Sequence, residues 1–331
     1  MDTRISFEDL RRRVCEALIA NGFAHDVALP IARTIAACER DGTPSHGLLR
    51  LPGYVEAVKT GWADGRVMPK LVNSAASMIV LDARNGFTHL ALAQARGDLA
   101  RFASATGCAL LLIRNAHHFA ALWPDIEDFA ADGLIAMSCV TSRARVTGWN
   151  GAKPVFGTNA SAFACPRANG PPIVWDQSAS VMSQGEILLA AREGRKLPAG
   201  VGVDARGKPT DDPAAVLEGG ALLPFGGVKG ASIAFMVEIL AAALAGAPFG
   251  FESPAQGTLP SKGGQFVMLI DPKRAGADVA ARVEPLVDAV HEAGSQHLPG
   301  SRRYARRAKS LAEGISIDAK TLESLEHLSH P

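Results

Sequence analysis

The strongest constraint on the fold is an alternation of short apolar runs and helical segments that begins near residue 78. SMIVLDA (77–83), CALLLI (108–113) and LIAMSCV (134–140) have the length and apolar character of buried strands. The segments 88–105 and 119–131, which lie between them, show the spacing of apolar residues that is typical of helices. Strands that alternate with helices in this way predict an α/β fold built around a sheet.

Helical segments precede this alternation, and a longer mixture of elements follows it. Residues 6–21 and 26–40 show helical spacing, and a third, shorter helical region near residue 46 is expected to be broken at Pro52-Gly53. Residues 141–160 read as a long polar loop, and 196–222 as an irregular connection. The remaining expected elements are strands over 172–176, 265–271 and 314–319 and helices over 183–193, 228–246 and 278–293.

Composition excludes several classes of protein. The 34 basic and 33 acidic residues nearly cancel, which argues against nucleic acid or an anionic membrane as a standing partner. The N-terminus has no apolar stretch of the kind that a secretory signal needs. The most apolar segment, 231–247, is short for a membrane span and carries Glu238 in its middle, so we expect a buried helix. The five cysteines form no CxxC pair, which favours free thiols and a cytoplasmic protein.

The segment DGTPSHGLLRLPGY (41–54) carries the clearest chemistry. Ser45 suits a helix N-cap, which places His46 in the first turn and Arg50 four residues further on the same face. The positive end of the helix dipole and the Arg50 guanidinium both disfavour a protonated His46. A substrate carboxylate held by Arg50 would offset that charge. The pair can therefore bind an α-keto or α-imino acid and donate a proton beside it.

Two other interpretations of this segment are open. A Ser-His pair at a helix start is often only a cap and a surface histidine. A Ser-His-Asp hydrolase is disfavoured, because Ser45 and His46 are adjacent and neighbouring helical side chains diverge. The chain also has no G-x-S-x-G elbow.

Further polar clusters follow the predicted strands. His117 and His118 come after CALLLI, where a loop of an α/β protein commonly holds a ligand, and adjacent histidines are poor partners for one metal ion. We therefore expect no metal site. GGVKG (226–230) opens a helix and could place backbone N–H groups against a phosphate, although no GxGxxG dinucleotide fingerprint is present. Asp176 and Glu186 are candidate acids in WDQSASVMSQGEI (175–187).

Taken together and in chain order, these segments resemble the type 2 malate/L-lactate dehydrogenase-like family of NAD(P)-dependent oxidoreductases. The matching segments are DGTPSHGLLRLPGY, RNAHHFAALWP, FGTN, IVWDQSAS, REGRKLPAGVGVDARGKPTDDP, LLPFGGVKG and HLPGSRRY. Within that family, HHFAALWPD is similar to the Δ1-piperideine-2-carboxylate/Δ1-pyrroline-2-carboxylate reductase branch.

The resemblance implies a fold and a set of roles. It implies a non-Rossmann, mixed-sheet cofactor domain over 76–277, a helical domain built from 1–75 and 278–331, and a homodimer. His46 would donate the proton with help from Ser45 and from Glu186, which stands where the branch has a relay aspartate; Arg50 would hold the substrate carboxylate and Thr158 would contact the substrate. The implied cofactor-binding residues are His117, His118, Phe119, Ala120, Ala121, Asp176, Gln177, Ser178, Gly227, Val228, Lys229, His297, Leu298, Pro299, Gly300, Ser301, Arg302 and Arg303.

The basic run near the C-terminus bears on the choice of cofactor. Arg302, Arg303, Arg306 and Arg307 form a reserve of positive charge for a 2′-phosphate, which favours NADPH and leaves NADH possible.

Several residues depart from the family pattern. Glutamate at position 186 has a longer stem than the usual aspartate, Gln184 stands where a histidine is common, and Val228 replaces the histidine of GGHKG. These departures bear on substrate range and cofactor preference rather than on the fold.

We therefore expect NADPH-dependent reduction of Δ1-pyrroline-2-carboxylate, Δ1-piperideine-2-carboxylate or both to L-proline and L-pipecolate. In that interpretation Leu122 and Trp123 of AALWP shape an apolar pocket for a ring. The first alternative is reduction of an open-chain 2-keto acid by the same residues. The second is a non-catalytic ligand-binding homologue.

Overall fold

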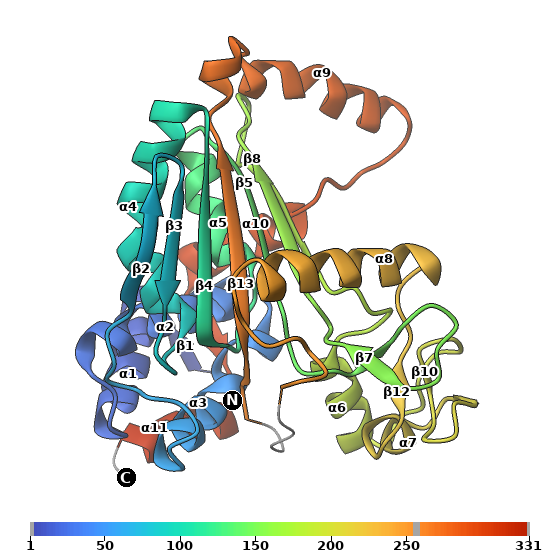
Figure 1. The fold of residues 1–331 in the computed structure, drawn as a ribbon. Coiled ribbons are helices and arrows are strands. Elements are labelled where there is room, and N and C mark those ends of the chain that lie inside the picture. The colour runs from blue at the N-terminus through green and yellow to red at the C-terminus, as the bar shows by residue number, and fades with distance from the viewer. Residues whose placement is uncertain (1–2, 254–258, 330–331) are drawn as a thin grey trace.

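A seven-stranded mixed sheet forms the centre of the molecule (Figure 1). The computed structural model describes residues 3–253 and 259–329. Within the large sheet only β3 and β4 run parallel, and every other neighbouring pair is antiparallel. In spatial order the strands are β2 (Lys70–Ala75), β3 (Met78–Asp82), β4 (Cys108–His118), β13 (Ser261–Ile270), β5 (Ile135–Val140), β8 (Ser161–Cys165) and β9 (Ile173–Gln177). The predicted α/β architecture with a mixed sheet is confirmed.

Helices cover the two faces of this sheet unequally. The helices α4 (Thr88–Thr106) and α5 (Trp123–Ala131) pack on one face and bury the main core. The helix α8 (Val228–Val237) and the π-helical turn η3 (Glu238–Ala243) cross the other face (Figure 1). Side chains of a strand alternate between faces, so Leu111 joins the first core and Leu112 the second.

The N-terminal helices and the C-terminal end pack together, as expected. Strand β1 pairs antiparallel with β14, from Thr3 opposite Ile317 to Ile5 opposite Ile315. Their shared apolar core lies beside the large sheet (Figure 1). The elements of this layer are β1 (Thr3–Ile5), α1 (Phe7–Ala20), α2 (His25–Arg40), α3 (Leu51–Lys59), α10 (Ser301–Glu313), β14 (Ile315–Ile317) and α11 (Ala319–Ser329). The helix α9 (Val279–Glu292) lies at the opposite end of the sheet, where Glu284 pairs with Arg167.

The segments expected as loops build a second, five-stranded sheet. Its strands have two or three residues each, too few for a recognisable period, which is why the sequence pattern missed them. They are β11 (Pro209–Thr210), β10 (Gly202–Val203), β12 (Ala221–Leu222), β6 (Val146–Thr147) and β7 (Pro154–Phe156), and they pack with α6 (Gln184–Arg192) and α7 (Pro213–Leu217). The expectations of a long loop over 141–160 and an irregular connection over 196–222 are therefore wrong in part. No element was predicted for β1, β2, β8, α10 and α11.

The helical region that carries the 41–54 motif is organised differently from the expectation. Two 3-10 turns, η1 (Pro44–His46) and η2 (Leu48–Arg50), are separated by Gly47, whose ψ of −134° interrupts the helix. The α-helix α3 follows, and Pro52 stands in its first turn. Proline is tolerated there because the first N–H groups of a helix have no intrahelical partner. Pro52-Gly53 therefore begins a helix instead of breaking one.

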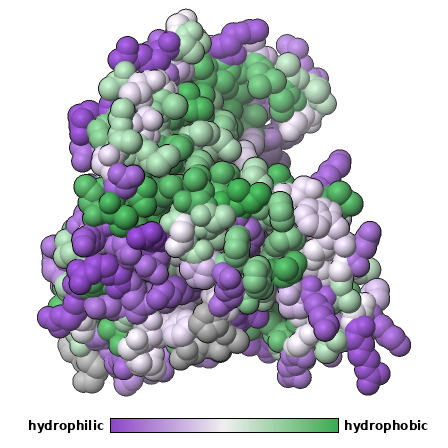
Figure 2. All heavy atoms as spheres, viewed as in Figure 1, coloured by the Kyte–Doolittle hydropathy of each residue, from purple (hydrophilic) through white to green (hydrophobic). Residues whose placement is uncertain are grey.

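The sequence predicts a buried helix over 231–247, but only one side of this helix is buried. One side of α8 and η3 is buried against the sheet, but Phe235, Met236, Ile239 and Leu244 are 38–48% exposed. Figure 2 shows apolar residues gathered across the middle of this face of the molecule. None of the helices within the described ranges has the length and apolarity needed to cross a membrane.

Candidate active site

The 3-10 turns bring Ser45, His46 and Arg50 into direct contact. Ser45 Oγ lies 3.1 Å from His46 Nδ1, and Arg50 Nε donates a hydrogen bond to the Ser45 carbonyl at 2.8 Å. The expected divergence of Ser45 and His46 is wrong because the backbone here is not α-helical. Ser45 also lies inside η1 rather than at its N-cap, which is Thr43. The three residues are brought together by a tight turn. The sequence pattern indicated one continuous helix and so did not predict this contact.

Arg50 is held between an aromatic ring and the start of a helix. Its Cζ lies 4.5 Å from the centre of the Phe119 ring, which is a cation–π arrangement. A Cβ on Gly53 would come within 2.6 Å of that ring, so this position needs glycine. A Cβ on Gly185, at the start of α6, would lie 3.3 Å from Arg50 Nη2. Among the described residues no carboxylate pairs with Arg50, and the guanidinium is therefore available to a carboxylate of a ligand.

The electrostatics of His46 agree with the sequence argument. Burial, together with the positive charge of Arg50 and the nearby His118, lowers the pKa of His46 to about 3. The imidazole is thus neutral at neutral pH as long as no anion is bound. A carboxylate on Arg50 would cancel part of that field and make the protonated imidazole easier to form.

The two adjacent histidines of β4 point to opposite sides, as neighbouring residues of a strand do. His117 is fully buried, with Nε2 3.1 Å from Asn85 Oδ1 and Nδ1 3.4 Å from the Pro260 carbonyl. We therefore do not retain its predicted cofactor role. His118 lies on the other side, where its charge acts on both His46 and Asp176. Both histidines belong to the strand and not to the loop that follows it.

Buried neutral histidines predict a loss of stability in acid. Burial lowers the pKa of His89 and of His117 from the ordinary 6.5 to about 4. Between those values the unfolded chain binds more protons than the folded chain, so the free energy of unfolding falls as the pH is lowered through this window. Urea titrations across the window will show this slope. His117→Gln will reduce it and the exposed His25→Gln will not; equal slopes in all three chains would contradict the expectation.

Asp176 connects β9 to the start of α5. Its Oδ2 accepts hydrogen bonds from the backbone N–H groups of Leu122 at 2.7 Å and Trp123 at 3.0 Å. Burial raises the pKa of Asp176 while these two donors oppose the shift. Arg303 packs its guanidinium 4.6 Å from the Trp123 ring and donates to the Val174 carbonyl at 2.7 Å. The structure thus brings Asp176 and Arg303, which are far apart in the sequence, to one place.

Leu122 and Trp123 do not line a pocket for a ring. Leu122 has no exposed surface and Trp123 is 3% exposed, and both belong to the main core. Their apolar character serves packing, which corrects the expected role.

The GGVKG turn packs beside the segment that follows Asp176. Gly226 and Gly227 have φ values of 56° and 61°, a left-handed conformation that glycine adopts readily. The Phe225 N–H donates to the Ala179 carbonyl at 3.0 Å, and Ala179 N–H donates to the Thr158 carbonyl at 2.7 Å. Thr158, the Gln177-Ser178 segment and the turn with Val228 and Lys229 are therefore neighbours.

The start of α10 offers unpartnered polar atoms. Gly300, with a φ of 86°, is the N-cap of the helix. Ser301 Oγ and Arg303 Nη1 are buried and have no hydrogen-bond partner among the described residues. Unpartnered donors of this kind fit a phosphate-bearing cofactor, and so do the first N–H groups of α8, which no side chain caps. His297, Leu298, Pro299 and Arg302 lie on the same segment, and His297, Pro299 and Arg302 are exposed.

Glu186 has a different partner from the expected one. Its Oε2 accepts a hydrogen bond from the Ser183 N–H at 2.9 Å, and Ser183 Oγ accepts one from the Glu186 N–H at 3.3 Å. This reciprocal pair is a capping box at the start of α6. No hydrogen bond joins Glu186 to His46 in the described structure, so a relay role for Glu186 stays a prediction.

Fewer than four arginines of the basic C-terminal run are free to bind a 2′-phosphate. Arg307 forms ion pairs with Asp41 at 2.5 Å and with Glu127 at 2.6 Å, and Arg303 packs on Trp123. The positive charge of Arg307 is thus paired with carboxylates inside the protein. Of the four, only Arg302 and Arg306 are exposed, and the predicted preference for NADPH now depends on these two.

The sequence argument missed a buried polar group behind His118. Asp125 Oδ2 lies 3.5 Å from His118 Nε2 and accepts a hydrogen bond from Gln265 Nε2 at 2.7 Å. The ring of His89 stacks on His118 with 5.9 Å between centres, and Tyr54 OH lies 3.5 Å from His89 Nε2. The available signal was that Asp125 stands one position before the apolar Ile126 in a helix whose large apolar residues are buried.

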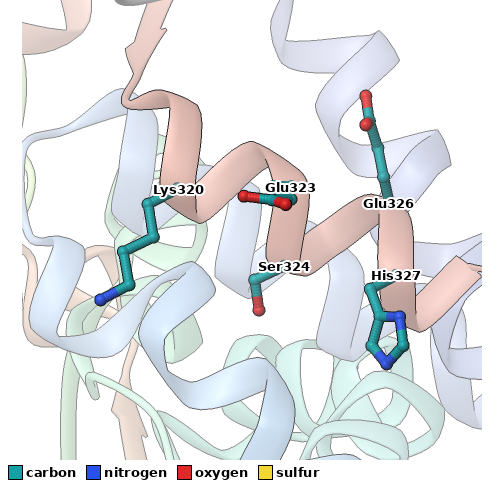
Figure 3. A pocket seen from close by; sticks show the side chains of 5 residues that line it. All are labelled: Lys320, Glu323, Ser324, Glu326 and His327. Atoms are coloured by element: carbon teal, nitrogen blue, oxygen red, sulfur yellow. The ribbon is translucent and has the colours of Figure 1, made fainter.

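A separate shallow pocket lies along α11 (Figure 3). Lys320, Ser324 and His327 point to one side of the helix and Glu326 to the other. None of the predicted site residues lines it.

Comparison with known proteins agrees with this geometry. Residues 5–326 match the family model described as malate/L-lactate dehydrogenase. The chain is similar to the Δ1-pyrroline-2-carboxylate/Δ1-piperideine-2-carboxylate reductases of Pseudomonas syringae pv. tomato (47% identity, covering 97% of this chain and 94% of the relative) and Pseudomonas putida (44%, 98% and 96%).

A solved structure extends the likeness to three dimensions. The crystal structure of Δ1-piperideine-2-carboxylate reductase from P. syringae matches with a TM-score of 0.96 at 45% identity, covering 98% of this chain and 99% of that one. Malate dehydrogenase from Entamoeba histolytica shares the fold at 21% identity, covering 99% of this chain and 98% of that one, with a TM-score of 0.89. As its collinear motifs indicated, the chain belongs to the malate/L-lactate dehydrogenase family.

Proposed function

We propose that the chain reduces a cyclic imino acid, Δ1-pyrroline-2-carboxylate or Δ1-piperideine-2-carboxylate or both, to L-proline or L-pipecolate with NADPH. The observation that carries this proposal is the contact of an unpaired guanidinium, Arg50, with a turn that bears a neutral imidazole, His46. The reductases named above, which share up to 47% of their residues with this chain, support the choice of an imine over a carbonyl.

Arg50 binds the substrate carboxylate. Its Nε is used by the Ser45 carbonyl, and the ring of Phe119 lies against the plane of the guanidinium. The remaining N–H groups are directed at a planar anion, which they bind more tightly than an ammonium group would. This contact orients C2 of the substrate and fixes the side of the C=N bond that is exposed to the cofactor.

His46 holds the proton for the imine nitrogen. Ser45 Oγ lies at Nδ1, so Nε2 is the ring nitrogen left for the substrate. The substrate carboxylate on Arg50 raises the proton affinity of His46 at the moment when a donor is required. When bound, the nicotinamide supplies the hydride that C2 accepts. Asp176 to Ser178, Gly227 to Lys229 and Ser301 to Arg303 are the segments that would hold the cofactor, with Arg302 and Arg306 at a 2′-phosphate.

The same residues could serve an open-chain 2-keto acid, and the family's malate and lactate members make this the second candidate. Loss of NADPH absorbance, followed with each substrate at equal concentration, decides between them. We expect turnover with the cyclic imines and little with pyruvate or oxaloacetate. Turnover with the keto acids alone would favour the second candidate. Cofactor binding without turnover on either class would indicate a ligand-binding homologue.

We also propose that the chain forms a homodimer through the outer side of α8 and η3. Phe235, Met236, Ile239 and Leu244 present an exposed apolar surface there. Next to it, the half-buried apolar residues of the sheet extend the same surface (Figure 2). An apolar area of this extent on one face is typical of a protein–protein contact.

Ile239→Glu will convert the dimer to a monomer, because a carboxylate at the contact cannot be desolvated without a partner. Light scattering on a size-exclusion column measures the mass. The matched control is Ile19→Glu, since Ile19 is 41% exposed on α1, away from this face. A wild-type chain that elutes as a monomer, or an Ile239→Glu variant that stays a dimer, would rule out this interface.

The cytoplasmic location and the two-domain division, 76–277 against 1–75 with 278–331, are part of the same proposal. Two elements do not fit that division: β2 (Lys70–Ala75) is a strand of the large sheet, and α9 (Val279–Glu292) lies at the end of this sheet away from the helical layer. All five cysteines are free thiols, which supports a reducing compartment.

A further inference from the structure

Glu238 is a buried carboxylate that the proposed reaction does not use. It is 5% exposed and begins the π-helical turn η3. Its Oε1 accepts a hydrogen bond from Asn159 Nδ2 at 2.9 Å, and Oε2 accepts one from the Gly250 N–H at 3.0 Å. The Gly157 N–H is a third donor. Within the described ranges no lysine or arginine pairs with it.

The three partners explain why this position carries a carboxylate. All of them are donors, and a carboxylate is the one side-chain group of this size that only accepts hydrogen bonds. A glutamine would turn an NH2 group toward at least one N–H and lose that bond. Burial raises the pKa of Glu238 even though these donors oppose the shift. Keeping the carboxylate buried therefore costs free energy of folding. Interruptions of an α-helix by a π turn are frequent at functional sites.

Glu238 acts directly on Asn159. This residue has no exposed surface and a φ of 40°, in the left-handed region. Its Nδ2 donates to Glu238 and to the Ala234 carbonyl at 3.1 Å, while its Oδ1 accepts from the Ser142 N–H at 3.3 Å. The side chain of Asn159 is thereby fixed from three directions.

Thr158 lies between the two residues that Glu238 holds. Its N–H donates to Ser142 Oγ at 3.0 Å, and its Oγ1 lies 3.3 Å from the same atom. Gly157 is tightly enclosed, since a Cβ there would come within 2.3 Å of the Ser142 carbonyl. The position of the Thr158 backbone therefore depends on Gly157 and Asn159, and both of these donate hydrogen bonds to the Glu238 carboxylate.

We propose that Glu238 is a positioning residue that holds the Gly157–Asn159 segment so that Thr158 meets the substrate. The inference deepens the proposed function, because it assumes the substrate contact of Thr158. Glu238 lies on the buried side of the helix, opposite the proposed dimer contact, and this inference gives it an effect on substrate recognition.

Glu238→Gln tests the assignment. We expect the KM for the substrate to rise by about tenfold to a hundredfold, because small displacements of a positioning group have effects of this size. The Kd of NADPH, measured by its fluorescence, should change little, since Asp176 is held by the backbone N–H groups of Leu122 and Trp123, and these bonds do not involve Glu238. The matched control is Glu252→Gln: Glu252 is exposed and accepts from Phe249 N–H at 2.9 Å in the same loop.

A double-mutant cycle separates positioning from a general loss of structure. If Glu238 acts through Thr158, the effects of Glu238→Gln and Thr158→Val on KM will be far from additive. Additive effects, or a Glu238→Gln variant that behaves like Glu252→Gln, would overturn the inference. Should Glu238→Gln not fold, Glu238→Asp keeps the charge and shortens the reach, and the same comparisons apply.

The result does not depend on the identity of the substrate. Kinetics use whichever class, cyclic imine or 2-keto acid, the wild-type chain reduces. Amide hydrogen exchange of residues 157–159 supplies a readout without turnover: exchange should accelerate in Glu238→Gln and not in Glu252→Gln. Unchanged exchange would count against Glu238 even if the proposed reaction is confirmed, and faster exchange would support it even if that reaction fails.

Discussion

Replacing His46 with glutamine will lower kcat by about a hundredfold to ten-thousandfold, the usual contribution of a positioned acid. Glutamine keeps a polar group of similar size next to Ser45 but cannot deliver a proton. The Kd of NADPH should stay near the wild-type value, since within the described ranges no hydrogen bond joins His46 to the proposed cofactor segments at Asp176 or Gly227. Steady-state kinetics and fluorescence titration measure the two quantities.

The control for this change is His25→Gln, an exposed histidine at the start of α2. It should leave kcat unaltered. A His46→Gln variant with nearly normal kcat would show that another group or a water molecule supplies the proton, and the assignment of His46 would then be wrong.

Replacing Arg50 with methionine will remove the carboxylate contact. We expect KM to rise strongly and kcat/KM to fall by about 3–5 kcal/mol of transition-state binding, the usual effect of losing one partner of a buried charge pair. Lysine should recover only part of this loss, because it retains a charge but not the planar pair of donors. Kinetics with the cyclic imine over a wide concentration range separate KM from kcat.

Arg96→Met is the matched control for the loss of an arginine stacked on an aromatic ring. Arg96 lies 4.3 Å from the centre of Phe129 and pairs with Asp132, away from the predicted site residues. It should leave KM unchanged. An Arg50→Met variant with the wild-type KM would remove the carboxylate contact from the proposal.

Local sequence patterns were sufficient for several of the regular elements. The helices α1, α2 and α4 and the strands β3, β5 and β9 lie within a few residues of their predicted bounds. A helix of fourteen residues or a strand of five repeats its apolar spacing often enough to be recognised without knowledge of its partners. Strands of two residues, such as β10 and β12, have no period, and they exist only because other strands lie beside them.

The direction in which a side chain points could not be predicted from local sequence patterns. His117 and His118 are adjacent and chemically identical, yet one is enclosed in the core and the other faces Asp125 near the site. Which of the two faces the site follows from the extension of β4 to residue 118, and that extension depends on pairing with β13. The contact of Ser45 with His46 likewise depends on the break at Gly47.

The family and the order of its motifs could be recognised from the sequence alone, because these are properties of side chains and their spacing. Only the tertiary structure decided which charges are already used and which surfaces are left open. Arg307 is neutralised by Asp41, 266 residues away, and Glu238 is bound by Asn159 and Gly250 from two separate loops. Such contacts arise between segments that no local pattern relates, and the free energy that selects them comes from burial and pairing across the whole fold.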